Sequence, residues 1–192
     1  LGRLPGTAVV SATSKDVPWQ AVFWNKTNVP LPVHSVDANY WDANNLEAVA
    51  GRLFSAADVD GKLRVCVVGT GLAESLGGAA GILGAYLPIS SDLYAVIGVV
   101  DGLQIGDRKR FVFVPLSTAV DRNPNKVVRV NRLFLRCKTW DDVPVMAAAI
   151  PRIVEAHQSS RFLKVEVSWD QLKRIIAIVW WVELFIYLSI CA

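Results

Sequence analysis

The chain has 192 residues, of which 53% are hydrophobic and 19% are charged, and its formal net charge is +3. This composition excludes a disordered tail, a collagen-like chain and a low-complexity segment, and the mild charge argues against a nucleic-acid-binding protein. The length suits one domain or two small ones. Because the chain begins Leu1-Gly2-Arg3 and its only methionine is Met146, we expect a fragment of a longer protein, without a signal peptide.

Short apolar runs separated by turn residues predict three strands in the first third of the chain. They cover Ala8–Ala12, Ala21–Trp24 and Leu31–Val36. Two prolines in and beside the third run favour an edge or irregular position for it. The polar and aromatic stretch Asp37–Asn45 that follows predicts one helical turn or a loop.

Further short runs with glycine punctuation follow in the middle of the chain. Arg64–Val68 predicts a strand, and Leu72–Leu76 predicts a short helix that ends at the two glycines after it. Leu93–Val100 and Phe111–Val114 are rich in β-branched and aromatic residues. Such runs are typical of strands that are buried on at least one face.

Val128–Cys137 predicts a strand because its last residues alternate with a period of two. One face carries Leu133, Leu135 and Cys137, and the other carries Arg132, Phe134 and Arg136.

A helix is predicted next, capped at its start by Asp141 or Asp142. Its apolar stripe at helical spacing consists of Val143, Ala147, Ile150 and Val154. We expect Pro151 to kink or interrupt the helix. Phe162–Val167 alternates again, so strand, helix and strand predict a βαβ unit, whose crossover should be right-handed.

The last eighteen residues differ from the rest of the chain in hydropathy. Ile175–Ala192 carries one charge, Glu183, and reaches the lower limit of the roughly 17–25 residues that cross a bilayer. This pattern predicts the start of a transmembrane helix, with a buried core helix as the alternative. Glu183 would then be protonated, turned toward neighbouring helices, or displaced toward an interface.

Two glycine-containing stretches resemble catalytic or nucleotide-binding motifs only superficially. The turn Gly69-Thr70-Gly71 follows a predicted strand, but Glu74 occupies the third glycine position of a dinucleotide fingerprint, where a carboxylate would repel phosphate. Ser75 lies in a sequence similar to a nucleophile elbow, yet it falls near the end of a short helix rather than at the strand-to-helix turn. We therefore expect no catalytic residue and no cofactor.

Metal binding and disulfide bonding are not indicated either. The chain has two histidines and no third ligand in local register with His34. Cys66 and Cys137 are widely spaced and flanked by apolar residues, so we expect two buried free thiols, with a disulfide between them as the alternative in an oxidising compartment.

Six short motifs, in order, carry a resemblance to a known family. They are Val36-Asp37-Ala38-Asn39-Tyr40-Trp41, Ala50-Gly51-Arg52-Leu53-Phe54 with Asp58, Val65-Cys66-Val67-Val68-Gly69, Leu83-Gly84, Tyr94-Ala95-Val96-Ile97-Gly98-Val99 and Phe113-Val114-Pro115-Leu116-Ser117-Thr118. Over about residues 4–190 the chain resembles the periplasmic core domain of MacB-like ABC transporter permeases, within the FtsX/MacB type.

The resemblance implies an α+β fold placed outside the cytoplasm, between the first and second membrane helices of a bacterial inner-membrane permease. A porter-like subdomain with βαβ units would comprise residues 1–47 and 127–170, and an inserted β-rich subdomain residues 48–126. Residues 171–192 would form a linker and the start of the transmembrane helix. Implied partners are an ATP-binding domain or subunit, a periplasmic adaptor or cargo, a second copy of the chain and the membrane. Nucleic acid is not among them.

Within these motifs we single out six residues as structural candidates. They are Gly51, Arg52, Asp58, Gly69, Gly98 and Pro115. Arg52 is the residue whose role is most specific: it would anchor the two subdomains through bidentate bonds to a carboxylate or to backbone carbonyls. The alternative is a surface arginine that follows a turn glycine.

Three functional hypotheses remain from the sequence. The first is a transporter domain that transmits ATP-driven motion to export or release of substrate and to periplasmic partners; macrolide, peptide, lipoprotein or purely regulatory roles all suit it. The second is a single-span, membrane-tethered periplasmic binding or scaffold protein. The third is a small hydrolase that uses Ser75 and His157.

Overall fold

The structure is a computed structural model of the whole chain. It describes residues 6–14, 22–24, 27–29, 31–101, 110–123 and 130–157. The fold is a mixed α/β one, which confirms the predicted fold class at that level. The chain divides into two compact units, one of Leu1–Ala8 with Cys137–Ala192 and the other of Val9–Arg136. The predicted boundaries of the porter-like and inserted subdomains stay a prediction.

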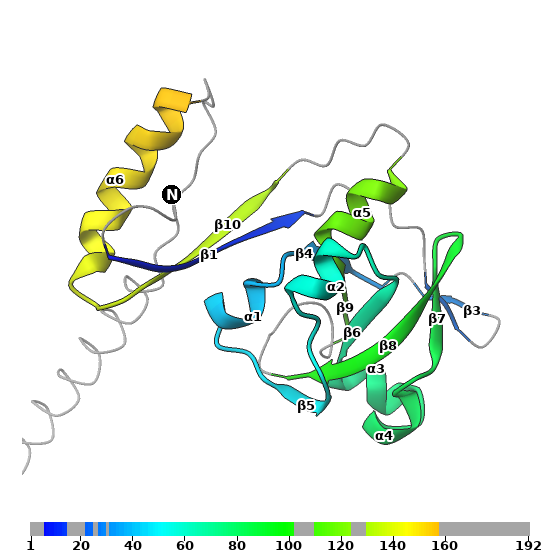
Figure 1. The fold of residues 1–192 in the computed structure, drawn as a ribbon. Helices are drawn as coiled ribbons and strands as arrows, with labels where there is room; N and C mark the ends of the chain where they lie inside the picture. The colour runs from blue at the N-terminus through cyan, green and yellow to red at the C-terminus, as the bar shows by residue number, and fades with distance from the viewer. Residues whose placement is uncertain are drawn as a thin grey trace, which may run out of the picture. The chain divides into compact units, whose positions relative to one another are not determined.

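Ten strands in the described residues belong to one sheet, with the order β10-β1-β4-β9-β6-β8-β7-β2-β3 and with β5 paired to β8 off this path (Figure 1). The strands are β1 Thr7–Ser14, β2 Val22–Trp24, β3 Thr27–Val29, β4 Val33–Val36, β5 Ala48–Gly51, β6 Val65–Gly69, β7 Tyr86–Ile89, β8 Asp92–Val100, β9 Val112–Pro115 and β10 Arg132–Cys137. The strands predicted before residue 138 are confirmed, with ends shifted by a few residues. β4 pairs with a strand on each side, so the edge position favoured by its prolines is wrong.

Six helices are described. They are α1 Tyr40–Ala43, α2 Ala56–Asp60, α3 Thr70–Ser75, α4 Ala79–Ile82, α5 Leu116–Arg122 and α6 Asp142–His157. Within the larger unit α2 and α5 lie side by side (Figure 1). The helical turn predicted within Asp37–Asn45 is confirmed as α1, and the short helix predicted near Leu72–Leu76 as α3.

The sheet is mixed because parallel and antiparallel pairs alternate through its centre. β4 pairs parallel with β9, and β6 pairs parallel with β8, whereas β6 and β9 are antiparallel. These central strands read as continuous apolar runs: every residue of β6 and of β9 is buried. Burial on both faces is what such runs predict.

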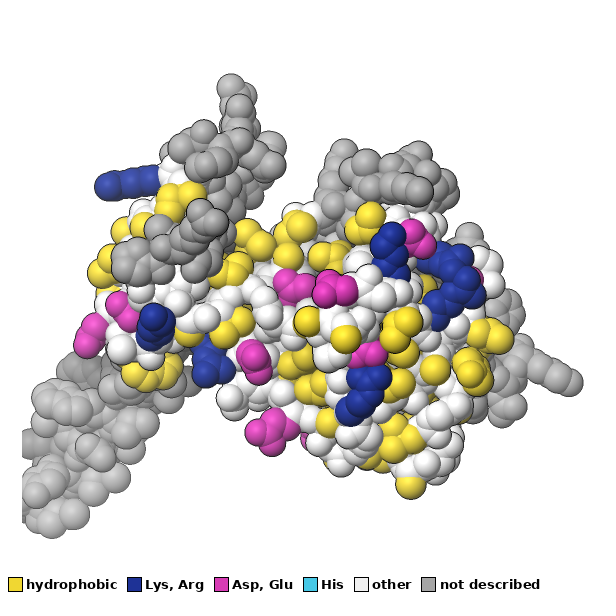
Figure 2. All heavy atoms as spheres, viewed as in Figure 1, with side chains coloured by type: hydrophobic (Ala, Val, Ile, Leu, Met, Phe, Trp, Pro, Cys, Tyr) yellow, Lys and Arg dark blue, Asp and Glu magenta, His cyan; other side chains and the backbone are white. Residues whose placement is uncertain are grey.

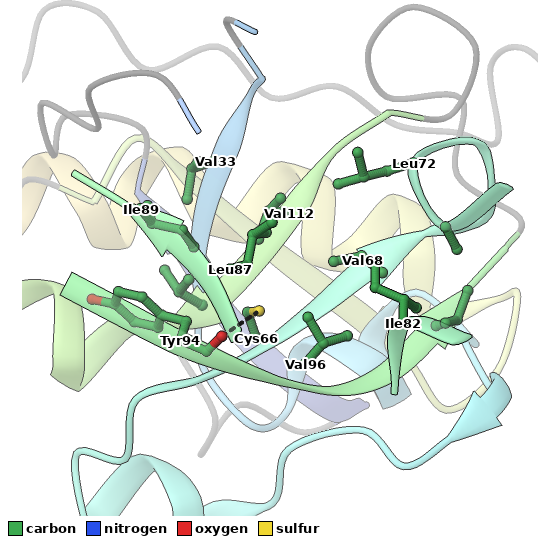
Figure 3. Packing of buried hydrophobic residues seen from close by; sticks show 13 residues of the cluster. Val33, Cys66, Val68, Leu72, Ile82, Leu87, Ile89, Tyr94, Val96 and Val112 are labelled. Atoms are coloured by element: carbon green, nitrogen blue, oxygen red, sulfur yellow. Dashed lines mark hydrogen bonds between the residues drawn. The ribbon is translucent and has the colours of Figure 1, made fainter. Parts of the chain in front are cut away.

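Two buried clusters lie on opposite faces of the central strands. In β6, Cys66 and Val68 belong to the first cluster, and Val65 and Val67 belong to the second. This division follows from the strand period of two. The first cluster, which includes Leu72 of α3 and Ile82 of α4, is drawn in Figure 3.

The second cluster is dominated by aromatic rings. Trp41 of α1 makes edge-to-face contacts with Phe54 and Phe113, at centroid distances of 4.8 and 5.4 Å. The indole Nε1 of Trp41 donates a hydrogen bond of 3.0 Å to the carbonyl oxygen of Phe54. Such rings combine a large buried area with a directional contact, and the indole hydrogen bond satisfies the buried polar atom.

Both faces of β10 are partly buried, through Phe134 on one face and Leu135 and Cys137 on the other. Phe134 packs against the aromatic cluster, with its ring edge-to-face to Tyr40 at 5.4 Å, while Leu133 is 42% exposed. Arg136, on the same face as Phe134, donates to the carbonyl oxygen of Asp42 at 2.8 Å. The predicted strand is confirmed as β10, and its neighbouring residues alternate between two faces.

The smaller unit is described through α6 and the residues near it. Met146 is the most buried of the side chains described on α6, and Thr7 Oγ1 lies 3.9 Å from its Sδ. The helix continues through Pro151, so it is not interrupted there, and the kink offered as the other outcome stays a prediction. A proline removes one backbone hydrogen bond, which a helix of this length tolerates when the remaining turns are bonded.

Several predictions fall outside the described residues. These are the strand Phe162–Val167, the right-handed crossover that depends on it, and the membrane span Ile175–Ala192 with Glu183. Among the helices that the structure describes, none is both long enough and apolar enough to cross a bilayer.

Candidate functional site

The motif that contains Gly51 and Arg52 lies at the end of β5, which pairs antiparallel with β8. Gly51 pairs with Gly98 in the antiparallel register, and the amide of Arg52 donates to the carbonyl oxygen of Ile97 at 2.9 Å. A Cβ atom built on Gly98 would overlap the carbonyl group of Arg52, and one on Gly51 would overlap the carbonyl oxygen of Ile97. The two backbones therefore approach as closely as only glycine permits.

Gly51 has a second requirement for glycine. Its φ is +70°, a region that L-residues with a side chain rarely adopt. The chain turns here from β5 toward α2, and the turn brings Arg52 and Asp58, which are six residues apart, into contact.

Arg52 and Asp58 form a bidentate ion pair. Nη1 of Arg52 lies 2.6 Å from Oδ2 of Asp58, and Nη2 lies 2.8 Å from Oδ1. The Arg52 side chain is 56% exposed, whereas that of Asp58 is 5% exposed. The carboxylate is thus fixed inside the fold, and the guanidinium covers it from the solvent side. An anchoring role for Arg52 stays a proposal, since both partners lie within the predicted inserted subdomain.

Asp58 is also the centre of a capping box at the start of α2. Its Oδ2 accepts hydrogen bonds from the amide of Ser55 at 2.7 Å and from the hydroxyl of Ser55 at 3.0 Å. With the two bonds from Arg52, the buried carboxylate accepts four hydrogen bonds. A carboxylate in the first turn of a helix is also favoured by the helix dipole. We call Gly51, Arg52, Ser55, Asp58 and Gly98 the β5–α2 clamp.

The contacts of the clamp shift the pKa values of Arg52 and Asp58. The hydrogen bonds from Arg52 hold the pKa of Asp58 well below its usual range, with the Ser55 donors acting in the same direction and burial opposing them. The hydrogen bond to Asp58 likewise raises the pKa of Arg52. Both groups are therefore charged at every pH at which the protein is expected to work.

The lowered pKa of Asp58 predicts a pH dependence of folding. Because the folded pKa lies below the unfolded value of about 3.9, the stabilisation is complete above that value and is lost as the pH falls through the folded pKa. We expect the stability difference between the wild type and Asp58→Asn to be constant above about pH 5 and to shrink below about pH 4. Urea unfolding midpoints of both proteins between pH 7 and pH 2.5 measure it. A difference that grows on acidification would contradict the assignment.

Side chains of α5 donate hydrogen bonds to carbonyl groups in α2 and in the segment that follows it. Ser117 Oγ donates to the carbonyl oxygen of Val59, and Thr118 Oγ1 donates to that of Leu63 at 2.9 Å. Val59 is in the last turn of α2, where carbonyl groups lack an intrahelical partner, and Leu63 lies three residues beyond the helix. The clamp is therefore linked to α5, which follows β9 directly.

Pro115 and Gly69 terminate central strands. Pro115 is buried, pairs with Val36 in the parallel register and precedes the first residue of α5. Gly69 ends β6, and its amide donates to the carbonyl oxygen of Phe111 at 3.0 Å. Both residues thus mark strand-to-helix turns.

A second carboxylate, Asp37, was not singled out in the sequence although it lies in the first motif. Its Oδ1 accepts from the hydroxyl of Ser11 at 2.6 Å, and its Oδ2 accepts from the amide of Ala12 at 2.8 Å. Asn39 adds a bond from its side-chain amide to the carbonyl oxygen of Val10 at 3.1 Å. These contacts span about 25 residues of chain, so no local pattern indicates them. The Ser55–Asp58 capping box, in contrast, has a readable Ser-x-x-Asp spacing.

The structure also describes the surroundings of Ser75, Cys66 and Cys137, the residues considered above for catalysis and for disulfide bonding. Ser75 is at the end of α3, as predicted, and its hydroxyl donates to the carbonyl oxygen of Leu72 at 2.7 Å. Cys66 and Cys137 are free thiols; Cys66 is fully buried, whereas Cys137 is half-buried rather than buried as expected. Burial raises the pKa of both thiols. Within the described ranges no group of three potential metal ligands occurs.

Comparison with known proteins gives a consistent result. A family model, the MacB-like periplasmic core domain, matches residues 3–153. The fold is similar to the periplasmic region of MacB from Actinobacillus actinomycetemcomitans, with a TM-score of 0.74 and 16% identity over 92% of this chain and 78% of that one. It is also similar to the extracellular domain of the noncanonic ABC-type transporter YknZ from Gram-positive bacteria, with a TM-score of 0.66 and 17% identity over 81% and 79% of the two chains. No curated protein sequence matches the chain significantly.

Proposed function

Because the chain belongs to the family of MacB-like periplasmic core domains, we propose that it transmits ATP-driven conformational change in an ABC transporter. The observation that carries this proposal is the family match over residues 3–153, which include the clamp and both buried clusters. The ATP hydrolysis would occur in a separate domain or subunit, and this domain would lie outside the cytoplasm of a cell with the permease in its inner membrane.

The packing of the larger unit suits a part that moves as a rigid body. Buried clusters lie on both faces of the central strands, and the clamp links β5 to α2 by charged hydrogen bonds. Densely packed interiors have low compressibility, so a displacement applied at one place moves the rest of the unit with little internal deformation. Transmission of motion needs this property and needs no catalytic residue.

The proposal is tested in the full-length permease, purified from its native membrane. We expect an ATP-hydrolysing domain or subunit to be part of the complex. In lipid nanodiscs with that ATPase, Arg52→Ala should lower the amount of substrate released per ATP hydrolysed while leaving hydrolysis largely intact. The matched control is Lys62→Ala, because Lys62 and its partner Asp121 are both exposed and such ion pairs contribute little.

One result would contradict the transporter role, and a second would contradict only the part assigned to the clamp. A parent protein with one membrane span and no associated ATPase would favour the alternative, a membrane-tethered periplasmic binding or scaffold protein. Equal release per ATP in Arg52→Ala and the wild type would show that coupling does not pass through the clamp.

A further inference from the structure

Two strands carry both chain connections between the two compact units. One boundary between the units falls after residue 8, within β1, and the other falls after residue 136, within β10. β1 and β10 are neighbours in the sheet and lie side by side (Figure 1). We call their part in the larger unit, residues 9–14 and 131–136, the ribbon, and we call the strands from β4 to β9 with both buried clusters the core.

The ribbon meets the core mainly through polar groups. β1 pairs with β4 at Thr13 and Ser14, and both of these polar side chains are buried. Among the described residues, no side chain of β1 belongs to either buried cluster, and Phe134 is the one residue of β10 that packs against them. Contacts of this kind within a chain permit relative motion, whereas large apolar interfaces prevent it.

Further polar contacts to the ribbon come from the segment that follows β4. Asp37 accepts hydrogen bonds from the hydroxyl of Ser11 at 2.6 Å and from the amide of Ala12 at 2.8 Å. Arg136 donates to the carbonyl oxygen of Asp42 at 2.8 Å. We call these three bonds the ribbon joint.

The ribbon joint lies at the surface of the larger unit. Asp37 is partly buried, and Arg136 and Asp42 are exposed. Figure 2 shows acidic side chains at the surface around α1 and α2. Water can therefore replace each bond of the joint when it breaks, so the net cost of breaking it is small.

The core is held together differently. β4 and β9 pair over four residues. Their side chains belong to both buried clusters, including Val33 and Val112 in the first and Val36 and Phe113 in the second. Parting these strands would bring apolar side chains into water, which is the dominant cost of unfolding. The ribbon joint should therefore open at a lower free energy than the core unfolds.

We propose that the ribbon joint opens and closes in the folded protein, as one cooperative step that leaves both the core and the ribbon intact. The joint is then a hinge: the core moves relative to the ribbon, through which both chain connections to the smaller unit pass. Segments with few buried apolar contacts open in this way without global unfolding. The inference goes beyond the proposed function and does not rest on it, because such opening is a property of the folded domain with or without an ATPase.

Hydrogen exchange of single amides in the full-length protein, held in lipid nanodiscs, tests the hinge. The amide of Ala12 reports opening of the joint. The amide of Asn131 donates to the carbonyl oxygen of Thr13 at 3.0 Å and reports separation of the two ribbon strands. The amide of Val112 donates to the carbonyl oxygen of Pro32 at 3.1 Å and reports unfolding of the core.

We expect the Ala12 amide to exchange at least tenfold faster than the Asn131 and Val112 amides, after correction for intrinsic rates. Arg136→Ala should raise the exchange rate at Ala12 at least threefold, because it removes another bond of the joint and so favours the open form. Arg152→Ala, at an exposed arginine of α6, is the control and should change that rate less than twofold.

Three results would overturn the proposal. Equal exchange rates at Ala12 and Val112 would show that the joint opens only when the core unfolds. A rate at Asn131 as high as that at Ala12 would show that the ribbon itself comes apart, and an Ala12 rate unchanged by Arg136→Ala would show that this amide exchanges alone. Release of substrate per ATP is assayed separately with Arg52→Ala, so each of these results leaves the proposed function standing.

Discussion

Gly98→Ala is expected to destabilise the protein by about 2–4 kcal/mol, which lowers the melting temperature by about 5–12 °C in a chain of this size. The added methyl group would overlap the carbonyl group of Arg52, which is backbone and moves only if β5 moves. Shifting β5 would also lengthen the hydrogen bond from the Arg52 amide to Ile97. Thermal unfolding of the purified chain in detergent measures the effect.

Gly81→Ala is the matched control, because it makes the same chemical change in an open position. A Cβ atom on Gly81 meets nothing within 4 Å, and the residue lies in α4. Alanine has the higher helix propensity, so we expect this variant to be neutral or more stable by up to about 1 kcal/mol. Equal melting temperatures of Gly98→Ala and Gly81→Ala would refute the close approach of β5 to β8.

Asp58→Ala is expected to destabilise the protein by about 2–4 kcal/mol. The substitution removes an acceptor of four hydrogen bonds, leaves the Ser55 amide without its cap and frees the Arg52 guanidinium. Arg52→Ala should cost less, about 1–2 kcal/mol, because its side chain is half exposed and its ion pair is partly screened by solvent. Thermal melts should therefore place Asp58→Ala below Arg52→Ala, and both below the wild type.

Asp60→Ala is the control for the Asp58 variant. Asp60 lies in the same short helix, but at its exposed end. Surface substitutions of this kind usually stay within about 0.5 kcal/mol. If Arg52→Ala left the melting temperature unchanged, Arg52 would be an ordinary surface arginine, which is the alternative considered from the sequence.

The central strands were predictable because their pattern is local and strong. β6, β8 and β9 consist largely of β-branched and aromatic residues, and burial on both faces makes such runs continuous. The Ser-x-x-Asp spacing of Ser55 and Asp58 is likewise a short-range signal, which indicates the start of a helix.

Several short helices were missed for a physical reason. α2, α4 and α5 span four to seven residues, too few for helical periodicity to emerge, and their stability comes from packing rather than from intrinsic propensity. The packing of Phe134 of β10 against the ring of Tyr40, nearly a hundred residues earlier in the chain, is likewise not a local feature. No window along the sequence contains both partners.

Local sequence predicted the central strands and the short helix after Gly69, because side-chain period and turn chemistry act over a few residues. The pairing of Arg52 with Asp58, the contact of Gly51 with Gly98 and the four bonds to one buried carboxylate required the folded chain. Such contacts depend on which strands pair and on which charged groups become buried. Both are set by the three-dimensional fold, and a pattern of a few neighbouring residues does not contain them.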